Sequence, residues 1–403
     1  MKKKLNIAFF LDNFFPQING VVTSSLNTIY ELSKRGHRIY GVVPRTNHNI
    51  LNYPNDYFPF QIQSHKGFSA HLYPDFVFTF PFSLKVIKAM KGFKPDIIHF
   101  HAPLTIGYKA IRCARKFKVP VIGTFHTFFA EPEYLSIIGM EKSKFLYKLA
   151  WLYSNQFFSR CDAVISPAKA TAKILTEKNN INKIHIIPNG VEVQKYKNYN
   201  FDSSKFPLKI KKNEEWILFI GRISKEKCLD VLFDAVYLVM QKRLNLKLLI
   251  IGDGPYKNVI QKKCKEKNIT QRVYFSGMIP NKDLLESGII KKMKLFVTSS
   301  TSENQPMTIL ESIMFGLPIV GVNAKGIPEL IDKNGFIVPP NNPEKMAEKI
   351  LKILENKTIC KKFSQKSLEL SKKYDIKLTT DKIEKLYYQL IENNKKLFRE
   401  NII

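Results

Sequence analysis

The sequence lacks the cysteine pattern of a secreted or zinc-binding domain. Its five cysteines, in 403 residues, are odd in number and far apart, and no two have CxxC spacing. This argues against a disulfide framework or a zinc site and favours a reducing compartment.

The chain also lacks an uninterrupted apolar run of the roughly 18 residues that cross a bilayer. The short run after the basic start ends at Asp12, too early for a secretory signal, so we expect any membrane contact to be peripheral.

Arginine is scarce although the chain is strongly basic. Lysine and arginine total 64 against 34 acidic residues, a net charge of +30, but only 10 of the 64 are arginine. No RNP, KH, zinc-finger or clustered-arginine signature accompanies the charge, so we expect no nucleic-acid partner. Two interpretations stay open: a generic solvated lysine surface, or attraction to an anionic bilayer or phosphorylated substrate.

What is present is a twofold series of alternating strands and helices. The first half predicts strands at 5–11, 38–43, 96–100, 120–124, 163–166 and 183–187, with helices at 21–34, 105–117 and 167–178. The second half predicts strands at 216–220, 246–251, 273–275, 295–297 and 318–322, with helices at 228–243, 256–267 and from 306. Short buried strands alternating with helices predict an α/β protein with two Rossmann-like, doubly wound parallel sheets. We expect domains at 1–195 and 196–374, joined within the polar stretch 195–213.

Two loops after strands of the first half are candidate ligand contacts, because ligands bind at the carboxyl ends of parallel strands. Gly20 closes the first loop and allows a close backbone approach to a ligand, or simply forms a turn. His126 follows the strand that ends at residue 124 and is suited to positioning an acceptor hydroxyl. A buried histidine bound to backbone is the alternative.

Two loops of the second half carry charged candidates. Arg222 and Lys227 follow Gly221 directly after a strand, where they suit a diphosphate or are ordinary solvated cations. Glu303 lies in the loop after 295–299, either as a ligand contact or as a helix cap. Glu311, eight positions on, is expected about two helical turns from Glu303 and in the same cleft, where a carboxylate in an apolar helix needs a partner.

The order and spacing of these segments resemble family 4 of the retaining glycosyltransferases, which have the GT-B fold. The resemblance covers nearly the whole chain. It rests on Asn19-Gly20-Val21, Ile187-Pro188-Asn189-Gly190-Val191, the GRxxxxK stretch from 221 to 227, Ile251-Gly252-Asp253-Gly254-Pro255 and the E-x7-E pair Glu303/Glu311. It implies two domains facing a central cleft, an acceptor-binding first domain, a nucleotide-sugar-binding second domain, and a C-terminal helix at about 375–391 that crosses back to the first domain.

The resemblance also implies roles for individual residues. Arg222 and Lys227 would hold the donor diphosphate, Glu303 the sugar hydroxyls and Glu311 the ribose, with His126 near the reacting sugar. The remaining donor contacts it implies are Gly20, Gly221, Gly254, Asn304, Gln305, Pro306 and Met307. Two departures stand out: Cys228 and Pro306 occupy positions where relatives often have glycine.

Within the family, the loops at 125–127 and 302–305 look most like bacterial and mycoplasmal diacylglycerol glycosyltransferases. The resemblance implies transfer of glucose or galactose from a UDP-sugar to diacylglycerol, without a metal or other cofactor, by a cytoplasmic enzyme bound to the inner face of the cell membrane. Basic, aromatic-rich segments at 57–93 and 142–160 favour contact with an anionic bilayer. The alternatives are a soluble or polymeric acceptor, a phosphatidylinositol mannosyltransferase-like activity, a sugar-nucleotide epimerase on the same fold, and a nucleic-acid-binding protein.

Overall fold

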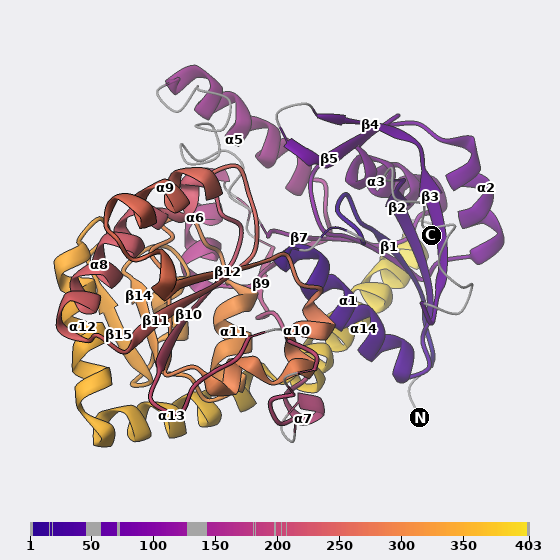
Figure 1. Cartoon of the computed structure of the whole chain (residues 1–403). Coiled ribbons are helices and arrows are strands. Elements are labelled where there is room, and N and C mark those ends of the chain that lie inside the picture. The colour runs from indigo at the N-terminus through magenta and orange to yellow at the C-terminus, as the bar shows by residue number, and fades with distance from the viewer. Residues whose placement is uncertain are drawn as a thin grey trace. The chain divides into compact units, whose positions relative to one another are not determined.

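The chain folds into two compact units in the computed structural model (Figure 1). Unit 1 comprises Met1–Gly190 and Ile376–Ile403, and unit 2 comprises Val191–Asp375. The structure describes residues 3–15, 17, 19–45, 58–70, 73–126, 143–179, 181, 183–196, 199–202, 204–206 and 208–400. The loop 125–127 and the segments 57–93 and 142–160 therefore lie only partly within the described residues.

Unit 1 contains a parallel sheet in the order β3-β2-β1-β6-β7-β8-β9. Its strands are β1 (Asn6–Phe10), β2 (Arg38–Pro44), β3 (Gln61–His65), β6 (Ile97–Phe100), β7 (Val121–Thr124), β8 (Ala163–Ser166) and β9 (Ile184–Ile186). An antiparallel hairpin, β4 (Gly67–Ala70) and β5 (Tyr73–Thr79), follows β3. The helices are α1 (Gly20–Lys34), α2 (Leu84–Phe93), α3 (Thr105–Phe117), α5 (Lys144–Phe158), α6 (Lys169–Asn179) and α14 (Ile376–Glu400).

Alternate residues of β1 enter two different cores, one on each face of this sheet. Ala8 and Phe10 pack in a cluster with residues of α2, α3 and α5. Ile7 and Phe9 pack in a cluster with residues of α1 and α14. Both faces of the sheet are therefore covered at β1, which explains why this strand is apolar from Ile7 to Phe10.

Unit 2 contains a second parallel sheet, in the order β12-β11-β10-β13-β14-β15. Its strands are β10 (Glu215–Ile220), β11 (Leu246–Ile251), β12 (Val273–Gly277), β13 (Leu295–Val297), β14 (Ile319–Val322) and β15 (Gly335–Val338). Its α-helices are α7 (Val193–Tyr196), α8 (Leu229–Lys242), α9 (Lys257–Glu266), α10 (Asn281–Ser287), α11 (Met307–Met314), α12 (Pro343–Glu355) and α13 (Lys357–Ser371). Short 3-10 helices are η3 (Lys225–Lys227), η4 (Thr270–Arg272), η5 (Ile289–Lys292), η6 (Ile327–Leu330) and η7 (Lys372–Tyr374).

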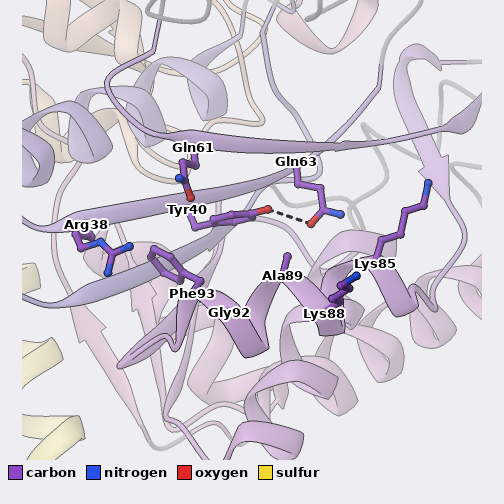
Figure 2. A pocket seen from close by; sticks show the side chains of 9 residues that line it. All are labelled: Arg38, Tyr40, Gln61, Gln63, Lys85, Lys88, Ala89, Gly92 and Phe93. Atoms are coloured by element: carbon purple, nitrogen blue, oxygen red, sulfur yellow. Dashed lines mark hydrogen bonds between the residues drawn. The ribbon is translucent and has the colours of Figure 1, made fainter.

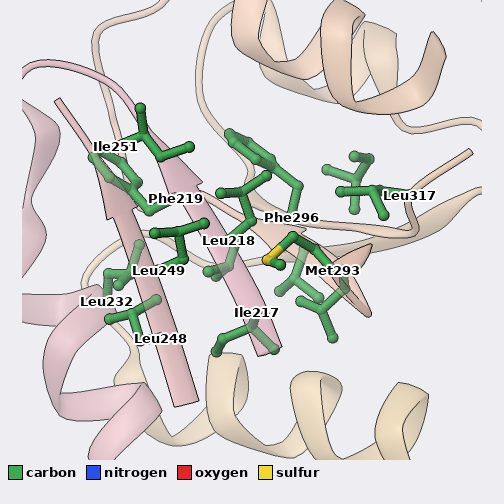
Figure 3. Packing of buried hydrophobic residues seen from close by; sticks show 14 of the residues in the cluster. Ile217, Leu218, Phe219, Leu232, Leu248, Leu249, Ile251, Met293, Phe296 and Leu317 are labelled. Atoms are coloured by element: carbon green, nitrogen blue, oxygen red, sulfur yellow. The ribbon is translucent and has the colours of Figure 1, made fainter. Parts of the chain in front are cut away.

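The core of unit 2 is built from the apolar strands predicted from the sequence. Figure 3 shows Leu218 of β10 beside Leu249 of β11 and Phe296 of β13, which are its partners in the sheet. In both sheets the strand order reverses beside the first strand, at β1/β6 in unit 1 and at β10/β13 in unit 2. Such topological switch points are where doubly wound sheets bind ligands.

The prediction of two doubly wound parallel sheets is confirmed, and so is the return of the C-terminal helix to the first domain. The predicted linker at 195–213 is wrong. Phe206 and Leu208 are buried in the core of unit 2, and the boundary between the units lies between Gly190 and Val191. The apolar residues of this polar stretch follow no helical or strand period, so the sequence gave no signal that they pack in the core.

Candidate active site

The turn after β10 brings the GRxxxxK residues to the switch point of unit 2. Gly221 and Arg222 leave the strand, and Lys227 ends the 3-10 helix η3. A second loop, after β11, packs against this turn. A Cβ atom at Gly252 would lie 2.0 Å from the carbonyl oxygen of Gly221, and one at Gly254 would lie 2.3 Å from that of Ile223. Gly254 is thus required for the two loops to touch.

Lys227 and Glu303 form an ion pair at this point, although 76 residues separate them. Lys227 Nζ donates to Glu303 Oε1 at 2.5 Å, and both side chains are largely buried. The pair joins the loop after β10 to the loop after β13, the two strands that flank the switch point. A cation and a carboxylate are therefore held together where a ligand of this sheet is expected to bind.

The backbone around the pair is fixed by residues that the sequence analysis missed. The Ser299 hydroxyl lies 2.9 Å from the carbonyl oxygen of Lys227 and 2.8 Å from that of Cys228. Gly326 N donates to the carbonyl oxygen of Glu303 at 3.1 Å. Ser299 is the second residue after the short strand β13. A hydroxyl at the carboxyl end of a strand was the signal available in the sequence.

Residues 304–307 lead from Glu303 into α11. Asn304, Gln305 and Met307 are buried, and Pro306 occupies the N-cap position without a side-chain capping bond. Glu303 binds Lys227 and does not cap the helix. The structure therefore brings Gly221, Arg222, Lys227 and 303–307 to adjoining loops of unit 2.

Glu311 lies inside α11 and is buried, with 3% of its surface exposed. Asn281 Nδ2, at the start of α10, donates to Glu311 Oε1 at 2.7 Å. Burial raises the pKa of the Glu311 carboxyl to about 7, against the hydrogen bond from Asn281, which lowers it. The expectation of two helical turns between Glu303 and Glu311 is wrong, because α11 begins only at Met307.

In unit 1, Asp12 and Gly20 follow β1. Asp12 is buried, and its carboxylate accepts hydrogen bonds from Ile106 N at 2.8 Å and Gly107 N at 2.9 Å, in the first turn of α3. Burial raises the pKa of Asp12 to about 7, against these two bonds. Gly20 is the first residue of α1, whose N-cap Asn19 accepts from Val22 N.

Histidines follow the two neighbouring strands, β6 and β7. His101 Nδ1 lies 2.9 Å from His126 Nε2, and the ring of His99 lies 4.4 Å from that of His101. His99 Nδ1 lies 2.6 Å from the Tyr387 hydroxyl of α14, and its Nε2 lies 2.7 Å from Thr124 Oγ1. Within the described part of the chain, His126 is thus hydrogen-bonded to a side chain, His101, and not to the backbone.

Burial keeps these histidines neutral. It lowers the pKa of His126 to about 4 and that of His99 to about 3, and it lowers the pKa of His101 well below its usual value. Sequence reasoning found His126 but missed Asp12, His99 and His101. The signal for His101 was the His-x-His pattern at the end of an apolar strand.

Comparison with known proteins agrees with this architecture. Residues 18–195 match the model of Glycosyltransferase Family 4, and residues 200–369 match that of Glycosyl transferases group 1. The chain is similar to the alpha-monoglucosyldiacylglycerol synthase of Streptococcus pneumoniae, with 29% identity over 82% of this chain and 74% of that protein. It is also similar to the enzyme of the same name from Acholeplasma laidlawii, with 26% identity over 98% and 99%. The fold is similar to that of Anabaena Alr3699/HepE, solved in complex with UDP, with a TM-score of 0.75, 16% identity, and 95% and 99% of the chains covered.

These matches identify the protein as a glycosyltransferase with the GT-B fold, which is built from two doubly wound sheets of this kind. The chain belongs to Glycosyltransferase Family 4 in its first half and to Glycosyl transferases group 1 in its second half.

Proposed function

We propose that this glycosyltransferase is a retaining enzyme that moves glucose or galactose from a UDP-sugar to 1,2-diacylglycerol, giving monoglycosyldiacylglycerol. The observation that carries the proposal is the Lys227–Glu303 pair at the switch point of unit 2. A cation and a carboxylate side by side suit the diphosphate and the hydroxyls of a nucleotide sugar. The names of the two relatives, both alpha-monoglucosyldiacylglycerol synthases, support the lipid acceptor.

The reaction breaks the bond between the anomeric carbon and the β-phosphate, so negative charge grows on the leaving UDP. Arg222 and Lys227 stabilise that charge in the proposed mechanism, and the N–H groups at the start of α11 add to it. Because these groups supply positive charge themselves, we propose that the enzyme needs no metal ion or other cofactor. Same-face attack, assisted by the leaving phosphate, retains the anomeric configuration.

Glu303, Glu311 and His126 are assigned to recognition. Glu303 accepts hydrogen bonds from the sugar hydroxyls and Glu311 from the ribose. Asn281 holds Glu311 at 2.7 Å and so fixes its orientation. His126, neutral because it is buried, hydrogen-bonds an acceptor hydroxyl.

Transfer from radiolabelled UDP-glucose and UDP-galactose, with and without diacylglycerol micelles, tests the reaction. We expect label in the lipid fraction only when diacylglycerol is present, and unchanged transfer in EDTA. Lys227→Ala and Glu303→Ala should each remove most turnover without unfolding the protein. Near-normal kinetics in these folded variants would overturn the site, and loss of activity in EDTA with recovery in magnesium would overturn metal independence. Label in a soluble sugar product instead would favour the polymeric acceptor.

An exposed apolar stripe on α5 supports the membrane part of the proposal. Phe145, Leu149 and Leu152 lie on one face of the helix, at i, i+4 and i+7, with 74%, 49% and 54% of their surfaces exposed. Lys148 is exposed on the same helix, while Trp151 is buried on its inner side. A helix with an outer apolar face bordered by lysines suits the interface of an anionic bilayer. Within the described residues, no helix combines the length and apolar character of a membrane span.

Other aromatic residues predicted for this surface divide between core and exterior. Phe80 and Phe82 are exposed, but Phe58 and Phe93 are buried in unit 1. Leu84, at the start of α2, is 88% exposed.

A groove of about 550 Å³ runs along α2, between this helix and β2 and β3 (Figure 2). Lys85 and Lys88 stand at one end, and Arg38 lies over the ring of Phe93 at the other. Tyr40 and Gln63, joined by a 3.3 Å hydrogen bond, lie between them. These three cations form no ion pair in the described part of the chain. We assign the groove to lipid headgroup phosphates, on the cytoplasmic face of the membrane.

Flotation with liposomes tests this surface. Binding to anionic vesicles should fall as salt rises from about 0.1 to 1 M, because the Debye length shortens from about 10 to 3 Å. Leu149→Glu should weaken binding about tenfold, because an apolar contact is lost. Leu244→Glu, at an 85% exposed position in unit 2, is the control and should change little. Equal binding by both variants would overturn the assignment of α5.

A further inference from the structure

His101 and His126 share a hydrogen bond whose direction can be deduced from the surroundings of their other nitrogens. The bonded atoms, His101 Nδ1 and His126 Nε2, are 2.9 Å apart. The ring planes differ by only 17°, and the centroids lie 5.1 Å apart, which exceeds the N–N distance by about the two ring radii. The rings therefore meet edge to edge, and the bond lies near both ring planes, along the lone-pair direction.

The second nitrogen of His101 decides which ring donates. His101 is 4% exposed, and its Nε2 is buried without a hydrogen-bond partner in the described structure. A neutral imidazole carries its proton on one nitrogen and a lone pair on the other. If Nε2 held the proton, a buried N–H donor would be left without an acceptor, which is the rarer and costlier defect in proteins. The proton is therefore on Nδ1.

The position of the ring proton on His101 determines the position of the ring proton on His126. Since His101 Nδ1–H is the donor, His126 Nε2 is the acceptor and carries a lone pair. The proton of neutral His126 must then be on Nδ1. The side chain of His126 is half-buried and makes no further hydrogen bond within the described part of the chain, so this N–H is available to a ligand.

We propose that His101 is a positioning residue, which donates from Nδ1 to His126 Nε2 and so makes His126 a hydrogen-bond donor to the oxygen of its ligand. This rests on the proposed function and deepens it. A protonated Nδ1 cannot take the proton of an acceptor hydroxyl, so His126 orients the hydroxyl oxygen and is not a general base. The departing phosphate therefore accepts the proton of the acceptor hydroxyl, in accord with same-face attack. The low pKa values of both rings agree with neutral histidines near pH 7.

Long-range 1H–15N correlation of the full-length protein, labelled with 15N-histidine, measures the tautomer directly. In the wild-type protein we expect His126 to be protonated at Nδ1 and bare at Nε2. His101→Phe removes the donor and should return His126 to the Nε2–H form that free side chains favour. His101→Asn places an amide N–H near the position of Nδ1 and should restore the Nδ1–H form. Tyr387→Phe, which removes a bond to His99 only, is the control and should leave the His126 signals unchanged.

Kinetics supply a second readout. His101→Phe should lower kcat on the order of tenfold to a hundredfold, with the KM for the UDP-sugar unchanged, and His101→Asn should recover much of the loss. A wild-type His126 protonated at Nε2, or a tautomer unaffected by His101→Phe, would overturn the proposal. If the wild-type protein transferred no sugar while the Nδ1–H tautomer was observed, the proposed function would fail and the role of His101 would stand.

Discussion

At the scale of single residues, the candidate site contains a carboxyl group, that of Glu311, whose pKa is raised by burial. Glu311 has an ordinary pKa near 4.5 in the unfolded chain and about 7 in the folded protein. Because the folded value is the higher one, the native state binds the proton more tightly. Glu311 therefore contributes stability that is fully present below pH 4.5 and is lost as the pH rises through about 7.

Glu311→Gln should accordingly be more stable than the wild type at pH 8, by roughly 3 kcal/mol, since each tenfold change in proton affinity is about 1.4 kcal/mol. The difference should shrink toward pH 5. Urea unfolding of both proteins between pH 5 and 8 measures it. The same variant should bind the UDP-sugar more weakly, because an amide is a poorer acceptor for ribose hydroxyls. A wild-type advantage at pH 8 would show that Glu311 has a native charged partner.

Cys228 has a backbone conformation that favours glycine. Its φ of 51° lies in the left-handed region, between η3 and α8, where a side chain is strained. Its Sγ makes two weak contacts, 3.9 Å from Glu226 O and 3.7 Å from Thr301 Oγ1. Cys228→Gly should therefore raise stability by about 0.5 to 1 kcal/mol. Cys228→Ala keeps the Cβ and should bring no gain. Thermal unfolding distinguishes the two variants, and equal gains would show that the sulfur, rather than the backbone, is unfavourable.

At the scale of elements, α14 is tied to α1 and to the residues that follow it. Glu384 of α14 accepts from His37 Nε2 at 2.7 Å and forms an ion pair with Arg35. The His37 side chain is fully buried, and its Nδ1 accepts from Leu5 N at 3.1 Å, so its Nε2 carries the proton. Hydrogen bonds from His37 and Arg35, partly opposed by burial, lower the pKa of Glu384.

Glu384→Ala should therefore destabilise the protein by about 2 kcal/mol, because a buried N–H donor loses its acceptor. Asp381→Ala is the matched control, since Asp381 also pairs with Arg35 but is 61% exposed, and it should cost less than about 1 kcal/mol. Chemical denaturation of both variants makes the comparison. Equal losses would mean that the ion pairs of Arg35, and not the His37 bond, hold α14.

The sequence predicted several elements that have mainly apolar strand residues or a helical period of buried residues. The strands at 163–166, 246–251 and 295–297 and the helix at 105–117 have the predicted bounds. It missed β3, whose residues are mostly polar, and it also missed the apolar strand β15. The sequence analysis treated the hairpin β4–β5 and helix α2 as one aromatic-rich surface segment, 57–93. The aromatic residues of this segment show no clear helical or strand period.

The candidate site divides in the same way. Arg222, Lys227, Glu303 and His126 were found because each follows a predicted strand at family spacing. Ser299 contacts Lys227, His101 contacts His126 and Asn281 contacts Glu311, and only the folded chain creates these contacts. The sequence around these three residues predicts strand ends and helix starts, but it does not predict which side chains they contact in the folded chain.

At the scale of the whole molecule, the net charge of +30 favours both anions in the proposed reaction, the UDP-sugar and the bilayer. Electrostatic attraction by the net charge does not by itself determine where on the protein the nucleotide binds. The account therefore depends on whether particular cations of unit 2, rather than the lysine-rich surface at large, bind the nucleotide diphosphate.

Calorimetric titration of UDP into the wild-type protein, Lys227→Ala and Lys225→Ala at one ionic strength tests this directly. Lys225 is an exposed lysine in the same 3-10 helix, so it carries the same charge without the ion pair to Glu303. We predict that UDP binds the wild type, that Lys227→Ala raises the Kd about tenfold or more, and that Lys225→Ala changes it little. Equal Kd values for the two variants, or no binding of UDP to the wild-type protein, would contradict the account.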